Sequence, residues 1–192
     1  MAKPRQSRKL TKLTFALVLG GAVTAAIVSH TGLGGSGRPH IARSSVSALA
    51  RSARAGDALP AQVLAYPFAE HNFAGRNGAG SRLLRSDGSL QVYAVPGKAG
   101  MVCLVEVDVA AQTAGGACAD RRILATGSIF TATRQEDGSE QVVGLVGDGA
   151  TFVQADGKQN RVENNAYVLR GIEGKEITIG SPGASATIDI GD

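Results

Sequence analysis

The sequence predicts a mainly β protein, a small antiparallel sandwich or partly open barrel, preceded by one N-terminal transmembrane or signal helix and a short stalk helix. Short runs rich in β-branched residues recur from residue 83 onward, and Asp-Gly or glycine-rich turns separate them. A turn about every eight to twelve residues is the spacing of antiparallel all-β domains. Strands that alternate with long helices, as in a βαβ fold, are absent from the pattern.

The chain begins with a basic head, residues 1–12, followed by an uncharged segment at 13–29. As a helix this segment would span roughly 26 Å, close to the ~30 Å hydrocarbon core of a membrane. The five basic residues of the head keep the N-terminus inside, so we expect a signal-anchor helix with the rest of the chain outside. A cleaved secretory signal is the alternative, because small residues suit the −3 and −1 positions of a cleavage site. The two candidate pairs are Thr24 with Ala26 and Gly32 with Gly34.

Residues 30–82 read as a linker or stalk. A glycine-rich spacer comes first, and a stretch of alanine, leucine and arginine follows it. These residues favour a short helix near 44–55, with Gly56 as its stop. Glycine and proline then return before residue 83.

Residues 83–192 form the expected β domain outside the cytoplasm. Asp87-Gly88 predicts a hairpin, and the nearly continuous β-branched run 101–107 predicts a central strand packed on both faces. Residues 119–126 fit a helical turn or a strand equally well. The expected strands lie near 83–85, 90–95, 101–107, 128–134, 141–146, 151–154, 161–162, 165–169, 176–179 and 186–190.

The distribution of charge argues against a nucleic-acid partner. The whole chain is basic, with a net charge of +4, but residues 86–192 hold eight basic and fourteen acidic side chains. A polyanion-binding domain needs a basic surface on its folded part. Aromatic residues make up 4% of the chain and Trp is absent, which disfavours base-stacking platforms.

Cys103 and Cys118 are the two cysteines of the chain. In an exported chain an even cysteine count predicts one disulfide. Neither cysteine lies in a Cys-x-x-Cys motif or near a histidine in the sequence, so we expect a structural bond rather than a redox or metal site.

The sequence offers no catalytic set, no metal-ligand set and no cofactor motif that stands in its required context. Gly32, Gly34 and Gly37 match a dinucleotide-binding spacing, but the strand and helix that the motif needs are missing. His30, His40 and His71 are isolated, and Asp137, Asp148 and Asp156 are each explained by turn chemistry, with calcium binding as the weaker reading. The sequence therefore predicts no catalytic residue, no metal and no cofactor.

A loose resemblance covers roughly residues 90–170. Val102-Cys103-Leu104, Cys118, Gly127, the run 143–150 and Asn165-Ala-Tyr167 resemble a group of uncharacterised exported or membrane-anchored proteins of high-GC Gram-positive bacteria. That group would have proline where Gly147 stands and valine where Ala150 stands. The resemblance implies an extracytoplasmic β domain with one disulfide and implies no activity.

We therefore expect a single-pass membrane protein, anchored through residues 13–29, whose β domain binds a protein or another envelope component and performs no chemistry. The alternative is a secreted hydrolase or transferase with a site built from scattered polar residues such as Asp148, Asn165 and Arg170. Convergence of these three side chains in one deep pocket would favour the enzyme. An open surface would favour the binding module.

Overall fold

The computed structural model describes residues 23–24, 42–135 and 137–191, which form three four-stranded antiparallel sheets with a few short helices. This confirms the mainly β, antiparallel class, and the sheets do not close into a barrel. The strand orders are β1-β6-β7-β10, β12-β11-β8-β9 and β2-β3-β4-β5. The elements are β1 (Val23–Thr24), α1 (Ser47–Ala50), α2 (Ala61–Leu64), α3 (Pro67–Asn72), η1 (Arg76–Gly78), β2 (Arg82–Asp87), β3 (Leu90–Pro96), η2 (Lys98–Gly100), β4 (Met101–Asp108), β5 (Thr113–Asp120), η3 (Arg121–Ala125), β6 (Ser128–Arg134), β7 (Glu140–Val146), β8 (Phe152–Ala155), β9 (Lys158–Arg161), β10 (Ala166–Ile172), β11 (Glu176–Ser181) and β12 (Ala184–Asp189).

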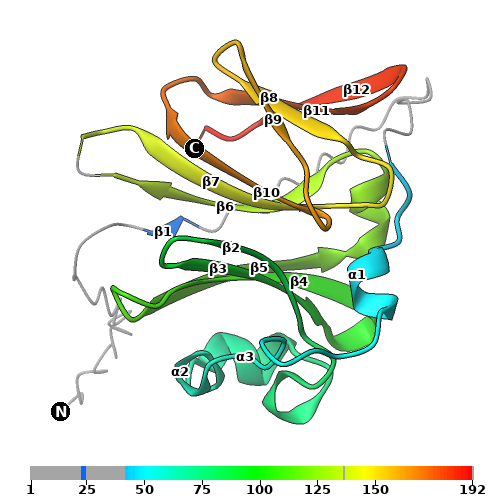
Figure 1. Ribbon diagram of the computed structural model, residues 1–192, viewed down its shortest axis with the longest axis vertical. Helices are drawn as coiled ribbons and strands as arrows, with labels where there is room; N and C mark the ends of the chain where they lie inside the picture. Colours follow the sequence, from blue (N-terminus) through cyan, green and yellow to red (C-terminus); the bar gives the residue numbers. More distant parts are fainter. Residues whose placement is uncertain (1–22, 25–41, 136, 192) are drawn as a thin grey trace, which may run out of the picture.

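The sheets are stacked in layers (Figure 1). The β2–β5 sheet lies below the sheet that contains β6, β7 and β10, and the β8, β9, β11, β12 sheet lies above it. Helices α2 and α3 cover the outer face of the β2–β5 sheet. Three apolar clusters fill the spaces between neighbouring layers, so the middle sheet is buried on both faces.

Strand β4 shows why its sequence is nearly continuously apolar. Successive side chains of a strand point to opposite faces. Val102 and Leu104 therefore join the cluster between the β2–β5 sheet and the middle sheet, while Cys103 and Val105 join the cluster between the β2–β5 sheet and the helices. β4 pairs with β3 on one side and β5 on the other. The predicted central strand is confirmed.

The hairpins follow the predicted turn chemistry. Strands β2 and β3 pair from Asp87↔Leu90 onward, and Gly88 between them has a φ of 64°. Asp156 and Gly157, which join β8 to β9, both have positive φ, at 47° and 72°. Two successive residues with positive φ match the right-handed twist of the flanking strands, which is why Asp-Gly is favoured here.

Every strand expected from the sequence overlaps an observed strand, and two strands, β1 and β5, were not expected. β5, Thr113–Asp120, lies between the expected strands 101–107 and 128–134, where the sequence predicts none. The undecided residues 119–126 divide between the end of β5 and the 3-10 helix η3, Arg121–Ala125. The Asp120 side chain accepts a hydrogen bond from the Arg122 backbone and so starts this helix.

Residues 42–82 are folded onto the sheets instead of forming a separate stalk. The helix expected over 44–55 is one turn, Ser47–Ala50, with Val46 and Ala48 buried between two sheets. It ends early because the Asp57 carboxylate accepts hydrogen bonds from the Arg51 side chain and the Arg54 backbone, which draws the chain into a turn.

The predicted basic head, residues 1–12, and most of the predicted membrane segment lie outside the described residues. From segment 13–29 the structure describes Val23–Thr24, which form strand β1 beside β6. None of the helices in the described ranges combines the length and the apolar character that a membrane span requires.

Candidate functional site

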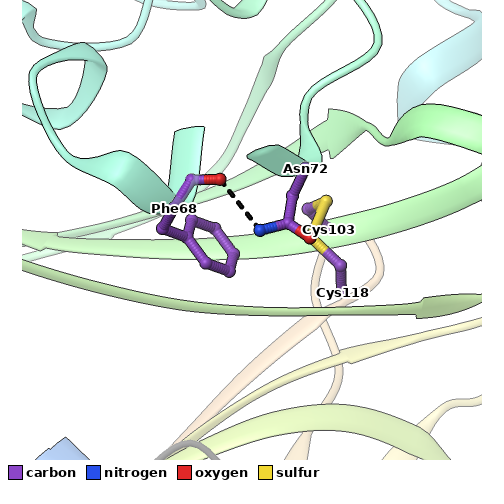
Figure 2. Close-up of a disulfide and its surroundings, with 4 residues drawn as sticks. All are labelled: Phe68, Asn72, Cys103 and Cys118. Atoms are coloured by element: carbon purple, nitrogen blue, oxygen red, sulfur yellow. Dashed lines mark hydrogen bonds between the residues drawn. A yellow bond between two sulfur atoms is a disulfide. The ribbon is translucent and has the colours of Figure 1, made fainter. Parts of the chain in front are cut away.

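The predicted disulfide joins two strands beneath a helix (Figure 2). Cys103 of β4 and Cys118 of β5 are direct cross-strand partners, and their sulfur atoms are bonded. Phe68 and Asn72 of α3 lie over the bond, and the Asn72 side chain donates a 2.9 Å hydrogen bond to the Phe68 carbonyl. Both cysteines are buried. The bond is therefore a structural link sealed from solvent, as the sequence predicts.

Two of the three residues of the enzyme alternative meet in the structure. The Asp148 carboxylate accepts hydrogen bonds from the Asn165 side-chain amide (2.9 Å), the Ser45 hydroxyl (2.7 Å) and the Ser47 backbone N–H (2.8 Å). Asn165 in turn accepts a bond from the backbone of Ala48. Both side chains therefore fasten residues 45–48 to the loops that follow β7 and precede β10.

The ionisation of Asp148 fits this fastening role. Burial alone would raise the pKa of its carboxyl, but the bonds from Ser45, Ser47 and Asn165 outweigh burial, and the net pKa is lowered. A carboxylate with a lowered pKa that already accepts three hydrogen bonds is a poor general base at neutral pH.

Arg170, the third residue of that alternative, lies elsewhere. Its guanidinium donates to the Asp87 carboxylate at 2.6 Å and to the Gln141 side chain at 3.2 Å. Arg170 therefore ties β10 to β2 and β7 and does not join Asp148 and Asn165. The structure does not bring the three proposed residues together.

The other polar residues singled out in the sequence bond within their own chain, Asp137 and His71 locally and Asp156 to the loop before β11. The Asp137 carboxylate accepts bonds from Ser139, and the Asp156 carboxylate accepts bonds from the backbone of Glu173 and Gly174. His71 lies beside the Pro67 carbonyl, one turn back in α3. His30 and His40 lie outside the described residues. Within the described part of the chain, no three His, Cys, Asp or Glu side chains are placed to hold a metal ion.

A buried ion pair, which sequence reasoning did not anticipate, fixes the chain ahead of α2. The Asp57 carboxylate is 6% exposed and receives both terminal nitrogens of Arg51, at 2.6 and 2.7 Å. It also accepts the backbone N–H groups of Arg54 and Leu83. Hydrogen bonding to Arg51 is the main reason that the pKa of Asp57 lies far below its ordinary value. Arg51 and Asp57 are six positions apart in the sequence, whereas side chains that pair along a helix are three or four positions apart. The sequence pattern therefore gives no signal of this ion pair.

A second buried acid, Glu106 on β4, has no such counter-charge among the described residues. Glu106 is 7% exposed, and burial raises the pKa of its carboxyl. The hydroxyl of nearby Thr131 lowers the pKa of Glu106, but less than burial raises it. This hydroxyl has no partner within hydrogen-bond geometry in the described structure. In the sequence Glu106 stands in an apolar run, and this interruption of the pattern is the signal that could have identified it.

The surface carries a groove between the helices and η1. Its volume is about 450 Å³, which is within the usual size of ligand sites. The apolar part comes from Leu64, Ala69 and Phe73, and the polar part includes Glu70 and Lys98. The Lys98 ammonium donates to the Glu70 backbone carbonyl at 2.8 Å, which holds this cation at the groove.

A second hollow, of about 340 Å³, lies at the β6–β7 turn and differs in character. Charged side chains of both signs line it, including Arg134, Glu140 and Glu173. The groove beside α3 has the larger apolar share of lining residues, so it is the better candidate for a binding surface.

Comparison with known proteins adds no relative to this picture. No family model, no curated protein and no solved structure matches the chain.

Proposed function

We propose that this chain is an exported, single-pass membrane protein whose β domain is a non-catalytic binding module for a protein or another component of the cell envelope. The anchor in this proposal is the uncharged segment 13–29 behind its basic head. The disulfide between Cys103 and Cys118 supports export, because such bonds persist in oxidising compartments.

The observation that carries the non-catalytic part is the engagement of the polar side chains. A catalytic acid or base must have a free position toward its substrate. Asp148 and Asp57 instead receive several donors each from their own chain. Arg170 is held by Asp87 and Gln141 on other strands. These groups support the fold.

The groove beside α3 is the binding surface that fits this proposal. Phe73 and Ala69, both nearly fully buried, give it an apolar floor, and Glu70 and Lys98 give it a charged rim. An apolar centre with a polar rim is the general anatomy of a recognition surface. The floor is continuous with the apolar cluster around the disulfide, to which Phe73 belongs.

Site-specific photo-crosslinking in the full-length protein tests this surface. A photo-reactive side chain is placed at exposed Glu70 on α3, or at exposed Lys158 on β9 as the control. Irradiation of intact cells that carry the protein should give a discrete adduct from position 70 and none from position 158. Equal adducts from both positions, or none from position 70, would contradict the groove as the binding surface.

Fractionation of the same cells tests the location. The full-length chain should be recovered with the membrane, with Cys103 and Cys118 unreactive toward thiol reagents until a reductant is added. Recovery of a thiol-reduced chain from the cytosol would overturn export. A turnover activity that is lost on Arg170→Ala substitution would support the enzyme alternative instead.

A further inference from the structure

Strand β6 has the sequence of an interior strand. Its first five residues, Ser128 to Ala132, are buried, and its one charged residue, Arg134, is the last. Strands at the edge of a sheet usually carry charges, proline or a bulge that discourage pairing with other chains. The edge strand β9 follows that rule, because all four of its residues are exposed and Lys158 and Arg161 stand at its ends. Before Arg134, β6 has no charged residue and no proline, so it lacks this protection.

The outer neighbour of β6 is the two-residue strand β1 (Figure 1). β1 pairs antiparallel with β6, with Val23 opposite Thr133 and Thr24 opposite Ala132. On its other side β6 pairs along its whole length with β7. If β1 leaves, β6 becomes the edge of the middle sheet.

The residues of β1 also belong to the predicted membrane segment. Val23 and Thr24 lie within the uncharged residues 13–29. A residue inside a membrane-spanning helix has its backbone N–H and C=O bonded within that helix. The same groups cannot also pair with β6, so the two positions of Val23–Thr24 exclude each other.

We infer that the outer edge of β6 is a strand-acceptor surface, filled by this chain's own Val23–Thr24 before membrane insertion and open to an extended strand of the same uncharged, β-branched character once residues 13–29 enter lipid. The inference rests on the proposed function, which supplies the anchor. Backbone hydrogen bonds provide the affinity in such strand addition, as in other sheet-edge recognition.

Disulfide trapping in the full-length chain tests where Val23–Thr24 lie. Cysteines are introduced at each of the two opposed pairs, Val23→Cys with Thr133→Cys and Thr24→Cys with Ala132→Cys. Both pairs are used because neighbouring pairs of an antiparallel ladder alternate between hydrogen-bonded and non-hydrogen-bonded, and the two kinds differ in Cα–Cα distance. The matched control joins Val23→Cys with Ser185→Cys on β12, in another sheet. Chain made without membranes should cross-link in at least one test pair and not in the control. In chain inserted into lipid vesicles the cross-linked fraction should fall about tenfold.

A peptide tests whether the vacated edge accepts a strand. The peptide carries residues 20–28 with Cys in place of Val23 and a lysine tail for solubility, and it is added to vesicle-inserted chain carrying Thr133→Cys. It should cross-link. A peptide with Thr24→Pro should not, because proline cannot donate to the sheet ladder.

Each outcome decides the inference. Absence of the cross-link in membrane-free chain, an unchanged cross-linked fraction after insertion, or no difference between the two peptides would overturn the acceptor edge. Extraction of the vesicles with alkaline carbonate reports insertion separately. If carbonate releases the chain, the anchor of the proposed function is wrong, and the cross-link in membrane-free chain then decides the acceptor edge alone.

Discussion

The side-chain amide of Asn165 donates a 2.9 Å hydrogen bond to the carboxylate of Asp148, and both side chains also bind the segment around α1. This segment crosses the ends of two sheets, with Val46 and Ala48 in the cluster between them. Two residues that suggested chemistry in the sequence therefore hold the layers together. The backbone at Arg43 lies so close to Gly147 that a Cβ added at Gly147 would collide with the Arg43 carbonyl.

Asp148→Ala should lower the free energy of unfolding by about 2 kcal/mol, since it removes three hydrogen bonds to a partly buried charged acceptor. Because the folded pKa of Asp148 is lowered, this stabilisation is present above the ordinary pKa of about 4 and is lost as pH falls through the folded pKa. Urea unfolding of both proteins at a series of pH values measures the difference. Asp137→Ala, at an exposed turn, should change stability much less. Equal losses for the two variants would refute the fastening role.

Asp57→Asn should destabilise the protein by about 2 to 3 kcal/mol, a value reduced because the Arg51 side chain remains 24% exposed. The substitution leaves Arg51 without its bidentate partner and weakens the bonds from Arg54 and Leu83. The folded pKa of Asp57 is lowered, so its contribution also disappears in acid. Thermal unfolding at neutral pH measures the loss.

Asp120→Asn is the matched control for that experiment. The Arg122 guanidinium lowers the pKa of Asp120 to about 2, but this pair is exposed on the surface. Solvent screening makes exposed pairs weak, so the control should unfold close to the unmodified protein. A similar loss in both variants would show that burial of Asp57 has no special effect.

Glu106→Gln should stabilise the protein at neutral pH by about 1 kcal/mol, the scale of one buried polar group without a partner. Burial raises the folded pKa of Glu106, so stability is full below the ordinary pKa of about 4 and falls as pH rises through the folded pKa. The neutral amide avoids that loss. Unfolding at pH 7 should separate the two proteins, and unfolding at pH 4 should bring them together. A less stable variant at pH 7 would contradict this account.

Replacing Cys103 and Cys118 together by alanine should cost up to ~3 kcal/mol, the loop-closure effect of a bond between residues 15 apart in sequence. Reduction of the unmodified protein in urea should cause a similar loss. The reductant must leave the double variant unchanged, because that variant has no bond to break. Loss of stability in the double variant without any effect of reduction would mean that packing under Phe68, rather than the bond, is responsible.

The sequence by itself determined the strands whose signals are local. Alternating β-branched residues and Asp-Gly turns depend on neighbours in the chain, so β2, β3, β4 and the β8–β9 turn could be predicted. The disulfide could also be predicted, from cysteine count and expected location. The membrane segment, the resemblance and the binding function remain predictions.

Tertiary structure alone decided the features whose partners are distant. β5 is rich in alanine and glycine and has little strand propensity. At Gly116 an added Cβ would lie 2.9 Å from the Phe68 ring and 2.8 Å from the Leu104 carbonyl, so only glycine fits between α3 and β4 there. Likewise Ser45 finds Asp148 103 residues further along the chain. Such contacts leave no periodic trace in the sequence. Burial and hydrogen bonding between layers depend on how the sheets and helices are placed relative to one another, and not on residues adjacent in the chain.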